Sequence, residues 1–532
     1  MKSAKKMVLA ILLIIAACVL LVGCTRSVGD ANALHKATNG GSVKVVDNVA
    51  TVTRTYKGKK NDIEITNDFT VSKSDSYFRE LVYASQLDSN LPGRMMSDSV
   101  INGNGHTITV TGDDNVTTLG SSTAGFFYRL MNCTVKDLNI VYDTKVSMKG
   151  YGSGDGFGGL VAYANDCTFI NCTVTYKTPL TFNAFPDRYG YNSRKVGGFI
   201  GSGTNCTFTN CRVNGEINGV AANFGGFAGS LTGGSVLDRC MFNGKLNTYS
   251  IEGCNIGGLV GYTDGDIKGC KVYLTDFDAV GEPQGWRQNT ACVGGIVGSL
   301  DGSALLKDSY LEFAPGATFS ISNKLNGTFG TEMHSGLVAG HALAGSSITR
   351  VYVNADTDFC TNVVCEDDIA LGLFNGEGSV DQVFFVENSF NVDYEETFDV
   401  VIDGDLMSGY STEFEIDGVN IHYSILTERD EDDVYHVTDA ELVIAGERIT
   451  LRNKDITTLD SIYLFHDTVD MYRYSVTLNL ETSKLTFKRT HNKIHLGGAT
   501  AVDDFDGIIF DSSDDSLWKF DENGKPYIEG LE

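Results

Sequence analysis

Proline and tryptophan are scarce in this 532-residue chain, which has six Pro and two Trp beside 60 Gly. So much glycine with so little proline fits either a disordered chain or a β structure with many tight turns. The accompanying Val, Ile, Phe and Tyr exclude disorder, because disordered chains lack the apolar residues that a core needs. We therefore expect a folded, glycine-rich β protein.

The familiar catalytic motifs are absent as well. None of the nine His is followed by Glu, so there is no His-Glu-x-x-His zinc motif. There is no Gly-x-Ser-x-Gly nucleophile motif, and no Gly-Lys pair is followed by the Ser or Thr of a phosphate loop. His491 and His495 are four residues apart, but the sequence before them is typical of a strand, so we expect packing or solvated histidines. The sequence predicts no catalytic residue and no metal ligand.

Long apolar runs are confined to the N-terminus. No later stretch reaches the ~18 apolar residues that a membrane-spanning helix needs. Lys2, Lys5 and Lys6 precede the apolar run 7–22, and a small residue and a cysteine follow it. This layout is typical of an export signal and not of a folded element. A plain signal peptide and an N-terminal membrane helix both fit the run.

The segment 21–24, Leu-Val-Gly-Cys, resembles the bacterial lipobox. That resemblance implies that residues 1–23 are removed as a signal and that Cys24 becomes the lipidated first residue. Residues 24–42 would then be a tether. The protein would be exported and anchored to the cell envelope, at the cell surface or in the periplasm, with the membrane as a partner through the lipid.

Positive charge is in deficit. The formal net charge is −27, and it becomes −30 if Lys2, Lys5 and Lys6 leave with the signal. Such a surface repels nucleic acid, so we exclude nucleic acid as a partner. Residues 381–532 hold 34 Asp and Glu but 11 Lys and Arg, half of the 68 acidic residues. This shift of composition predicts a domain boundary near residue 380.

One short phrase recurs through the middle of the chain: a glycine pair, two apolar residues, then Gly or Ala and a polar residue. Successive copies start 34, 39, 28, 32, 37, 41 and 36 residues apart. A period in this range indicates a repeat array whose units bury their apolar faces against their neighbours. The copies start at Gly158, Gly197, Gly225, Gly257 and Gly294, with weaker ones at Ala124, Ser335 and Leu371.

Each unit is a pair of short strands. After the phrase at Gly197 come a glycine turn, the alternating segment 206–213 and an Asn-Gly turn, and no segment has helical periodicity. Strands of this length, repeated every 30 to 40 residues, predict an all-β, right-handed parallel β-helix of about eight degenerate repeats. The glycine pair would permit a positive φ or a close backbone approach. A glycine-bearing hairpin in an antiparallel sandwich is the alternative.

The phrase, followed by a strand with Asn-Cys and Val, resembles the GLUG repeat. The segment 101–108 is similar to the entry strand before such arrays, and 517–527 to a closing segment after them. The resemblance implies a β-helical solenoid of bacterial surface proteins, including adhesin-like proteins and non-catalytic parts of large secreted peptidases. It carries over no catalytic residues.

Cysteines recur at fixed distances from the phrase starts, and eleven remain after Cys18 and Cys24. A repeated register predicts a ladder of buried thiols, whose Cβ atoms ~4.8 Å apart lie slightly beyond the usual disulfide range. Disulfides stay possible in an exported protein, and the Cys-x4-Cys spacing is not that of a zinc site. Asn132, Asn171 and Asn210 could form amide stacks. The ladder comprises Cys133, Cys167, Cys206, Cys172, Cys211, Cys240 and Cys270.

Two acidic clusters, 428–433 and 503–515, lie near the C-terminus. Calcium takes several oxygen ligands, but neither cluster has EF-hand spacing, so we favour solvated loops and expect no cofactor. The hairpin signals 413–423 and 472–488 predict an acidic antiparallel β domain or cap over 381–532. Residues 43–123 would form an N-terminal β cap and first rungs, with a short helix at 77–87, and residues 124–380 the β-helix.

These features favour a non-catalytic, lipid-anchored envelope protein that binds a host protein, matrix or glycan. Tyr189, Tyr191 and Trp286 on inserted loops could make contacts, although most exposed aromatics are incidental. A carbohydrate-active β-helix enzyme, lyase or glycoside hydrolase, would need carboxylates lined up on neighbouring rungs. A structural spacer is the third possibility.

Overall fold

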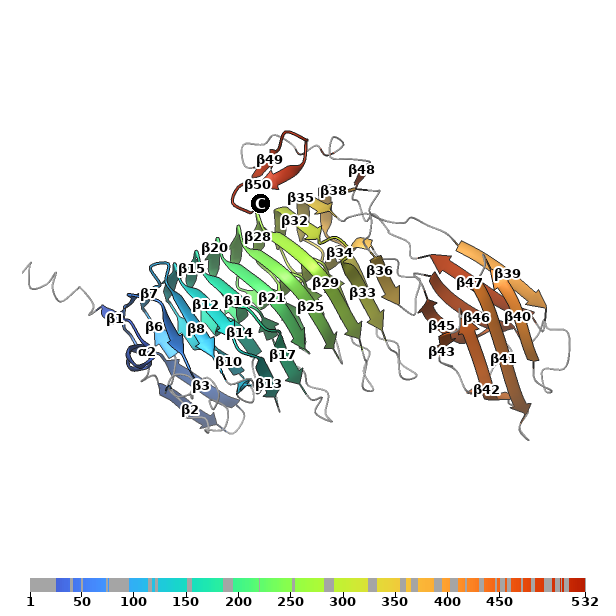
Figure 1. The fold of residues 1–532 in the computed structure, drawn as a ribbon, viewed down its shortest axis with the longest axis horizontal. Coiled ribbons are helices and arrows are strands. Elements are labelled where there is room, and N and C mark those ends of the chain that lie inside the picture. Colours follow the sequence, from blue (N-terminus) through green and yellow to red (C-terminus); the bar gives the residue numbers. More distant parts are fainter. Residues whose placement is uncertain are drawn as a thin grey trace, which may run out of the picture.

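The computed structural model describes most of the chain from residue 25 to 531, and Figure 1 shows its arrangement. Over 395–491 it describes mainly the strand backbones. The residues outside the description are 1–24, 39–41, 49–50, 73–74, 76–94, 113–116, 120–122, 151–155, 185–194, 220, 251–253, 282–290, 324–332, 355–359, 365–371, 387–394, 402–409, 417–418, 430–434, 445–446, 450–454, 457–460, 470–471, 480–483, 492–499, 503–507, 509, 511–515 and 532.

The glycine phrases form one parallel sheet, here called the glycine sheet. Gly197 pairs with Gly225, and Gly225 with Gly257, each in parallel register. The predicted stacking of successive units is thereby confirmed. Its strands are β6 (Met95–Ser97), β10 (Thr123–Met131), β14 (Gly156–Asn165), β18 (Lys195–Gly197), β19 (Ile200–Thr204), β22 (Asn223–Gly225), β23 (Ala228–Thr232), β26 (Asn255–Gly257), β27 (Val260–Thr263), β30 (Ala291–Gly294), β31 (Val297–Leu300), β34 (Met333–Ala342) and β37 (Gly372–Gly376).

The second strands of the units pair in a separate parallel sheet of 24 strands, here called the long sheet. Thr134, Thr168 and Thr207 share one register position on three successive rungs. Its strands are β1 (Arg26–Val28), β4 (Ile63–Ile65), β5 (Phe69–Val71), β7 (Val100–Asn102), β8 (Thr107–Thr111), β9 (Thr117–Leu119), β11 (Thr134–Lys136), β12 (Asn139–Asp143), β13 (Val146–Gly150), β15 (Thr168–Ile170), β16 (Thr173–Tyr176), β17 (Leu180–Ala184), β20 (Thr207–Thr209), β21 (Arg212–Gly219), β24 (Val236–Asp238), β25 (Met241–Ser250), β28 (Asp266–Lys268), β29 (Lys271–Gly281), β32 (Leu305–Phe313), β33 (Thr318–Asn323), β35 (Ser347–Asn354), β36 (Cys360–Val364), β38 (Ser379–Val386) and β48 (Thr500–Val502).

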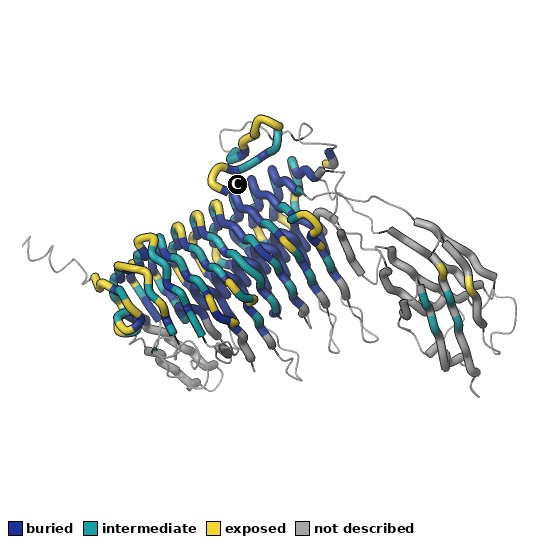
Figure 2. Tube along the Cα trace, in the orientation of Figure 1, coloured by how far each residue is buried: buried dark blue, intermediate teal, exposed yellow. Residues whose placement is uncertain are grey.

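Strands of both sheets alternate along the chain and pair with their counterparts one unit later, so the chain winds as a parallel β-helix. The fold class predicted from the repeats is correct. The apolar side chains of the core are almost fully buried, and the trace of the coil is accordingly mostly dark blue and teal in Figure 2. Like side chains stack on like: the rings of Phe169 and Phe208 lie 4.9 Å apart and nearly parallel, and those of Phe199 and Phe227 4.7 Å apart.

The glycine pairs are required by close approach between rungs. A Cβ on Gly198 would lie 2.3 Å from the carbonyl oxygen of Gly226, and one on Gly226 2.2 Å from that of Gly258. The amides of Gly198 and Gly226 donate to those same oxygens at 3.1 Å, so the backbones cannot separate without losing the bonds. None of these pair glycines has a positive φ. Of the two reasons offered for the pair, the backbone approach is confirmed and the positive φ is wrong.

The N-terminal end differs from the expected tether and β cap. β1 pairs in parallel with β4, so the coil begins at Arg26, inside the segment 24–42. The helix α2 (Ala31–Thr38) follows, with its Ala33 amide bonded to the Asp30 carboxylate, and its buried side chains join the core of the coil. The expected helix at 77–87 lies outside the described residues. β2 (Ser42–Asn48) and β3 (Thr51–Lys57) form an antiparallel hairpin.

The C-terminal part is an insertion and a return, not one terminal domain. After β38 the chain leaves the coil, and β48 comes back to pair in parallel with β38. The predicted hairpins are both confirmed, with Ile416 opposite Val419 and Tyr472 opposite His491. The inserted antiparallel strands, which Figure 1 shows beyond the end of the coil, are β39 (Glu395–Val401), β40 (Tyr410–Ile416), β41 (Val419–Arg429), β42 (Tyr435–Ile444), β43 (Glu447–Ile449), β44 (Asp455–Ile456), β45 (Ser461–Val469), β46 (Tyr472–Asn479) and β47 (Lys484–His491).

The last described residues, 516–531, lie against the outside of the coil and are here called the strap. They contain a short antiparallel hairpin of β49 (Trp518–Phe520) and β50 (Pro526–Ile528). The side chain of Arg212, on β21, donates to the Gly530 carbonyl at 2.5 Å, and the indole of Trp518 to the Arg350 carbonyl at 2.9 Å. The strap therefore runs from β35 back to β21. Among the described residues, no helix is long and apolar enough to cross a membrane.

Candidate functional site

Two columns of polar side chains run along the glycine sheet, and we call them together the polar seam. The residue two before each glycine pair forms one column, and the sixth residue of the phrase forms the other. Both follow from strand register, because equivalent residues of successive units are paired. The first column is Lys195, Asn223, Asn255, Cys292 and His334, and the second is Ser202, Ser230, Tyr262, Ser299 and His341.

The kink within each phrase brings the two columns together. β18 ends at Gly197 and β19 begins at Ile200, so the strand is interrupted at the second glycine of the phrase. A Cβ on Gly201 would lie 3.0 Å from the Lys195 carbonyl oxygen, so the two arms of the kink touch. Glycine at position 201 leaves room for the side chains of the two columns to face each other.

Contacts within the seam join both columns and successive rungs. The Lys195 ammonium donates to the Ser202 hydroxyl at 3.5 Å, and the Asn255 amide donates to the Asn223 amide oxygen at 2.8 Å. At one end of the seam, the rings of His334 and His341 stack with centroids 4.5 Å apart. Half-buried amide, ammonium and imidazole groups thus stand at fixed spacing along the axis, whereas the hydroxyls of Ser202, Ser230 and Ser299 beside them are buried.

Aromatic side chains border the same surface. Tyr163 pairs with Ser202 from the rung before the second column begins, and the Arg129 guanidinium lies 4.6 Å from its ring centroid. Tyr262 donates its hydroxyl to the Asp301 carboxylate at 2.5 Å. Burial raises the pKa of Tyr262, and the hydrogen bond to Asp301 adds to the rise, so this tyrosine stays protonated. Tyrosine rings with fixed polar neighbours suit contact with the faces of sugar rings or with peptide groups.

Cys292 is set apart from the other cysteines that the structure describes in full. The next residue, Val293, belongs to the core of the coil. Side chains alternate along the strand, so Cys292 points to the outer side, where it is 5% exposed. Its register partner on the next rung is His334. A thiol and two imidazoles therefore gather at the same end of the seam, although no group of three or more His, Cys, Asp or Glu among the described residues is placed to hold a metal ion.

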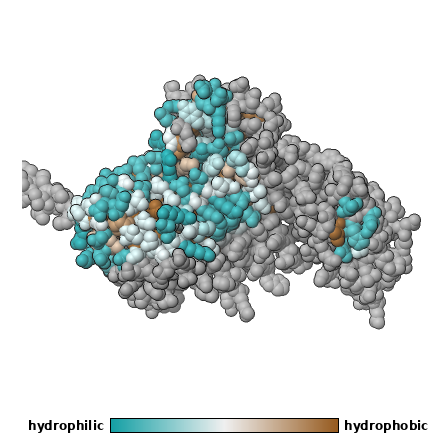
Figure 3. Space-filling view, in the orientation of Figure 1, coloured by the Kyte–Doolittle hydropathy of each residue, from teal (hydrophilic) through white to brown (hydrophobic). Residues whose placement is uncertain are grey.

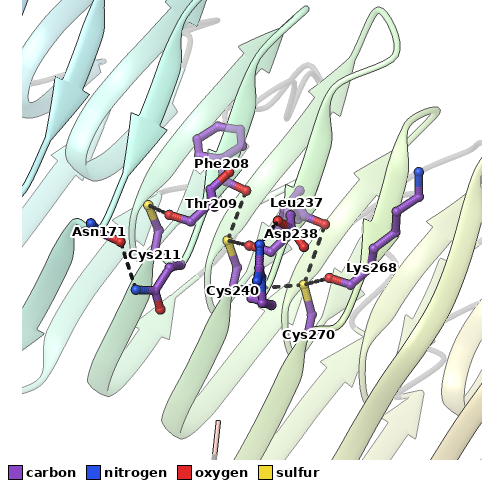
Figure 4. Close-up of polar contacts among 11 residues, drawn as sticks. Asn171, Phe208, Thr209, Cys211, Leu237, Asp238, Cys240, Lys268 and Cys270 are labelled. Atoms are coloured by element: carbon purple, nitrogen blue, oxygen red, sulfur yellow. Dashed lines mark hydrogen bonds and ion pairs between the residues drawn. The ribbon is translucent and has the colours of Figure 1, made fainter. Parts of the chain in front are cut away.

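The predicted cysteine ladder exists as two columns. Cys133, Cys167 and Cys206 form one, continued by Ser235, whose hydroxyl accepts from the Cys206 amide at 3.0 Å. Figure 4 shows the second column, where Cys211, Cys240 and Cys270 follow Cys172 on successive rungs. The nine cysteines whose side chains are described are all buried thiols outside any disulfide, as predicted.

Burial raises the pKa of the Cys211, Cys240 and Cys270 thiols well above the ordinary value. Their sulfurs point at backbone carbonyls of their own coil, as at 3.3 Å between Cys270 Sγ and the Lys268 oxygen. Groups this hard to ionise are poor nucleophiles and poor metal ligands. Cys211, Cys240 and Cys270 therefore fill the coil and are no reactive site.

The amide stack is confirmed in part. Asn210 donates its amide to Asn171 at 2.9 Å, and Asn171 donates to the Asp137 carboxylate at 2.9 Å. All three have φ near +50°, the left-handed region that short polar side chains tolerate. Asn132 belongs to the other column and donates to Asp98 at 2.7 Å, because the two cysteine columns follow two different turns.

Several predicted positions lie outside the described side chains. Cys24, Tyr189, Tyr191, Trp286 and most of the acidic cluster 503–515 belong to segments that are not described. The cluster 428–433 begins at the end of β41, and His491 ends β47, where the backbone alone is described. The structure therefore leaves the lipidation at Cys24 and the expectation about calcium as predictions.

Sequence reasoning missed the polar seam, although the signal was present. The sixth residue of the five clear phrases is Tyr or Ser, and the residue two before the pair is polar in most of them. Simple strand alternation would place these two residues on opposite faces of the sheet. The kink at the second glycine shifts the alternation, so both side chains lie on one surface. The outer surface visible in Figure 3 is also mostly hydrophilic along the coil.

Comparison with known proteins leaves the function open. No family model matches the chain, and no curated protein matches it. A putative immunoglobulin A1 protease from Bacteroides ovatus is 13% identical with a TM-score of 0.27, covering 88% of this chain and 86% of that one. A tailspike protein double mutant of E. coli bacteriophage HK620, solved with a pentasaccharide, is 11% identical with a TM-score of 0.19, covering 82% and 79%. Likenesses this weak carry no argument, and the fold assignment rests on the strand register.

Proposed function

We propose that the protein is a cell-envelope binding protein, anchored through a lipid on Cys24, whose coil presents the polar seam to an extended ligand. The ligand that fits this surface best is a glycan chain. The GLUG-like phrases and the lipobox-like segment 21–24 support the envelope location. The seam supports the binding role.

The observation that carries this proposal is the periodic alignment of the seam. Side chains such as Asn223 and Asn255 repeat at the rung spacing, ~4.8 Å, on a backbone held by both sheets. Fixed, repeated hydrogen-bonding groups beside tyrosine rings bind a linear, polar ligand with little loss of side-chain entropy. A stiff coil keeps that alignment over several rungs.

The carbohydrate-active enzyme is the weaker candidate. Its chemistry needs two carboxylates facing each other across a sugar bond. The ten residues of the two seam columns include no Asp or Glu, and the Asp301 carboxylate, which contacts the seam, already accepts the Tyr262 hydroxyl. The side chains on the seam favour holding a ligand over cleaving it.

A glycan array with the purified protein, followed by a turnover assay on each bound polysaccharide, tests the proposal. We expect binding without release of reducing ends or unsaturated products. The double variant Asn223→Ala, Asn255→Ala should weaken binding at least tenfold, while Thr207→Ala, an exposed change on β20, should leave it unchanged. Binding that ignores the seam variant would contradict the proposed surface, and turnover would favour the enzyme.

A further inference from the structure

The strap covers a patch with its own small core, separate from the interior of the coil. On the coil side, Met241, Tyr310, Tyr352 and Phe384 occupy one register column of the long sheet. They are 1–9% exposed and belong to a hydrophobic cluster distinct from the main core. Without the strap, this column would be accessible to solvent, as the same column is at the half-buried Thr173.

Aromatic contacts hold the strap to this column. The Trp518 indole tilts against Tyr310 with ring centroids 5.6 Å apart, and it also stacks at 4.8 Å on Phe510, which precedes the strap. Ile528 and Leu531 are 2% and 1% exposed. The Tyr310 hydroxyl donates to the Leu531 carbonyl. Most of the contact between the strap and the coil therefore comes from a few side chains.

Charged groups lie beneath the strap and are paired on the coil side without it. The Lys271 ammonium is 2.8 Å from the Glu312 carboxylate, and their side chains are 9% and 17% exposed. Lys525 of the strap adds a contact of 3.2 Å to the other oxygen of Glu312. Because Lys271 and Glu312 keep each other neutralised, exposing them to water leaves no unpaired buried charge. This ion pair therefore remains intact on the coil when the strap leaves.

The strap has no ladder of backbone hydrogen bonds with the coil. Among the described strands, β49 and β50 pair with each other alone. An isolated two-stranded hairpin is marginal in water, so the strap should dock and undock as one piece. The coil loses no strand pairing when the strap leaves.

We propose that the strap is a releasable cover that undocks as a unit while the coil stays folded. Release exposes a face five rungs long with Tyr310, Tyr352, Lys271 and Glu312 on it. That face is a second surface, distinct from the polar seam, and the proposal does not depend on the function given above.

Tryptophan fluorescence tests this directly, because the chain has two Trp and the change Trp286→Phe leaves Trp518 as the reporter. During urea unfolding of this full-length variant, we expect the Trp518 emission to shift red, and its acrylamide quenching to rise, at lower urea than the loss of far-ultraviolet β signal. Coincident transitions would overturn the proposal, since the strap would then be part of the same cooperative unit.

Two lysines on the strap supply a matched pair of variants. Lys525→Ala removes the contact to Glu312 and should lower the urea midpoint of the Trp518 transition without moving that of the coil. Lys519 pairs with Glu529 on the strap itself, so Lys519→Ala should leave both midpoints in place. Equal effects of the two lysines, or a shift of both transitions together, would count against a releasable strap.

Hydrogen exchange on the unmodified protein gives an independent reading. Amides of β49 and β50 should exchange with a smaller opening free energy than those of the glycine ladder at Gly198 and Gly226. Equal protection of the strap and the ladder would reject the proposal even if the Trp286→Phe variant failed to fold.

Discussion

Single residues decide how closely the rungs of this coil can stack. At the glycine pairs, two backbones meet where a Cβ would overlap a carbonyl oxygen, as at Gly198. At the turns, left-handed backbone is taken by Asn, Asp and Arg residues such as Asn171 and Arg350. At the pairs glycine is thus selected for space, whereas at the turns left-handed backbone is shared between these polar residues and glycines such as Gly269.

Replacing Gly198 by Ala should lower the free energy of unfolding by about 3 kcal/mol, because the added methyl meets backbone that cannot move away. Gly203→Ala is the matched control. Its Cβ would meet the ends of the Leu231 and Ile200 side chains, which can shift, so the loss should be clearly smaller. Urea unfolding of both variants measures the difference. Equal losses would mean that the close approach is not what selects glycine.

The stacked thiols should be unreactive in the folded protein. Burial raises the pKa of Cys211, Cys240 and Cys270, so almost no thiolate exists at pH 8. We expect iodoacetamide to leave these three unmodified until denaturant is added, as mass spectrometry of peptides will show. Disulfide-linked peptides from this column under non-reducing digestion would contradict the description of free thiols.

At the scale of elements, the stacking of equivalent turn positions on successive rungs decides which charges can be buried. Arg350 follows the turn position of Asp308 by one rung, and the two form a bidentate pair with nitrogen–oxygen distances of 2.6 and 3.0 Å. Their side chains are 9% and 1% exposed. Arg239 has the same turn conformation but makes an exposed contact with Asp238.

Arg350→Ala should therefore cost about 3–5 kcal/mol of stability, because it leaves the Asp308 carboxylate buried without its partner. Arg239→Ala at the equivalent turn should change stability by no more than about 0.5 kcal/mol. Chemical denaturation of the two variants gives the comparison. A small effect at Arg350 would show that water or another group replaces the guanidinium.

Stability should also depend on Glu312 in acid. Burial acts to raise the pKa of Glu312, but the hydrogen bond and charge of Lys271, with the charge of Lys525, outweigh it and hold the pKa below the ordinary value. The ionised form is thus favoured in the folded state. Its contribution is complete above the unfolded pKa of about 4.3 and is lost as the pH falls through the lower folded pKa.

We expect Glu312→Gln to be less stable than the parent at pH 7, with the gap narrowing as the pH falls from 5 to 3. Urea midpoints at several pH values measure that gap. A constant gap would show that the ionisation of Glu312 contributes nothing to the folded state.

The whole molecule is a coil with its chain start at one end and an inserted antiparallel unit at the other (Figure 1). β1, at Arg26, follows two residues after Cys24. If Cys24 carries the lipid, the coil rises directly from the membrane, and each rung adds ~4.8 Å of height. The inserted strands β39 to β47 would then be displayed farthest from it.

Cys24→Ser should move the protein from the membrane fraction to the soluble fraction of expressing bacteria, because a lipid chain supplies most of the membrane affinity. Detergent partitioning and the mass of the N-terminal peptide measure the change. Retention of the variant in membranes would favour an uncleaved N-terminal helix instead.

Several elements could be predicted from the sequence, and each prediction had a physical reason. The recurrence of the glycine phrase at 28 to 41 residues was enough for parallel stacking, since only repeated units place equivalent residues in columns. The hairpins at Ile416 and Tyr472 followed from turn residues between alternating strands. Both signals are regular spacings along the chain, so they can be counted in the sequence without knowledge of the tertiary contacts.

Other features could not be read from the residues. The helix α2 is eight residues long and is fixed by burying Leu34 and Ala37 on the first rungs, so its tertiary contacts outweigh its weak local signal. The return of β48 to the coil depends on an open strand edge at β38, which lies more than a hundred residues earlier in the chain.

The amino-acid sequence by itself determined the repeat, the β class and the ladders, because each depends on spacing along one chain. The tertiary structure decided which polar columns face each other across the kinked phrase, where the strap lies and which charges it covers. Those outcomes depend on contacts between residues such as Arg212 and Gly530, far apart in sequence, whose pairing no local spacing encodes.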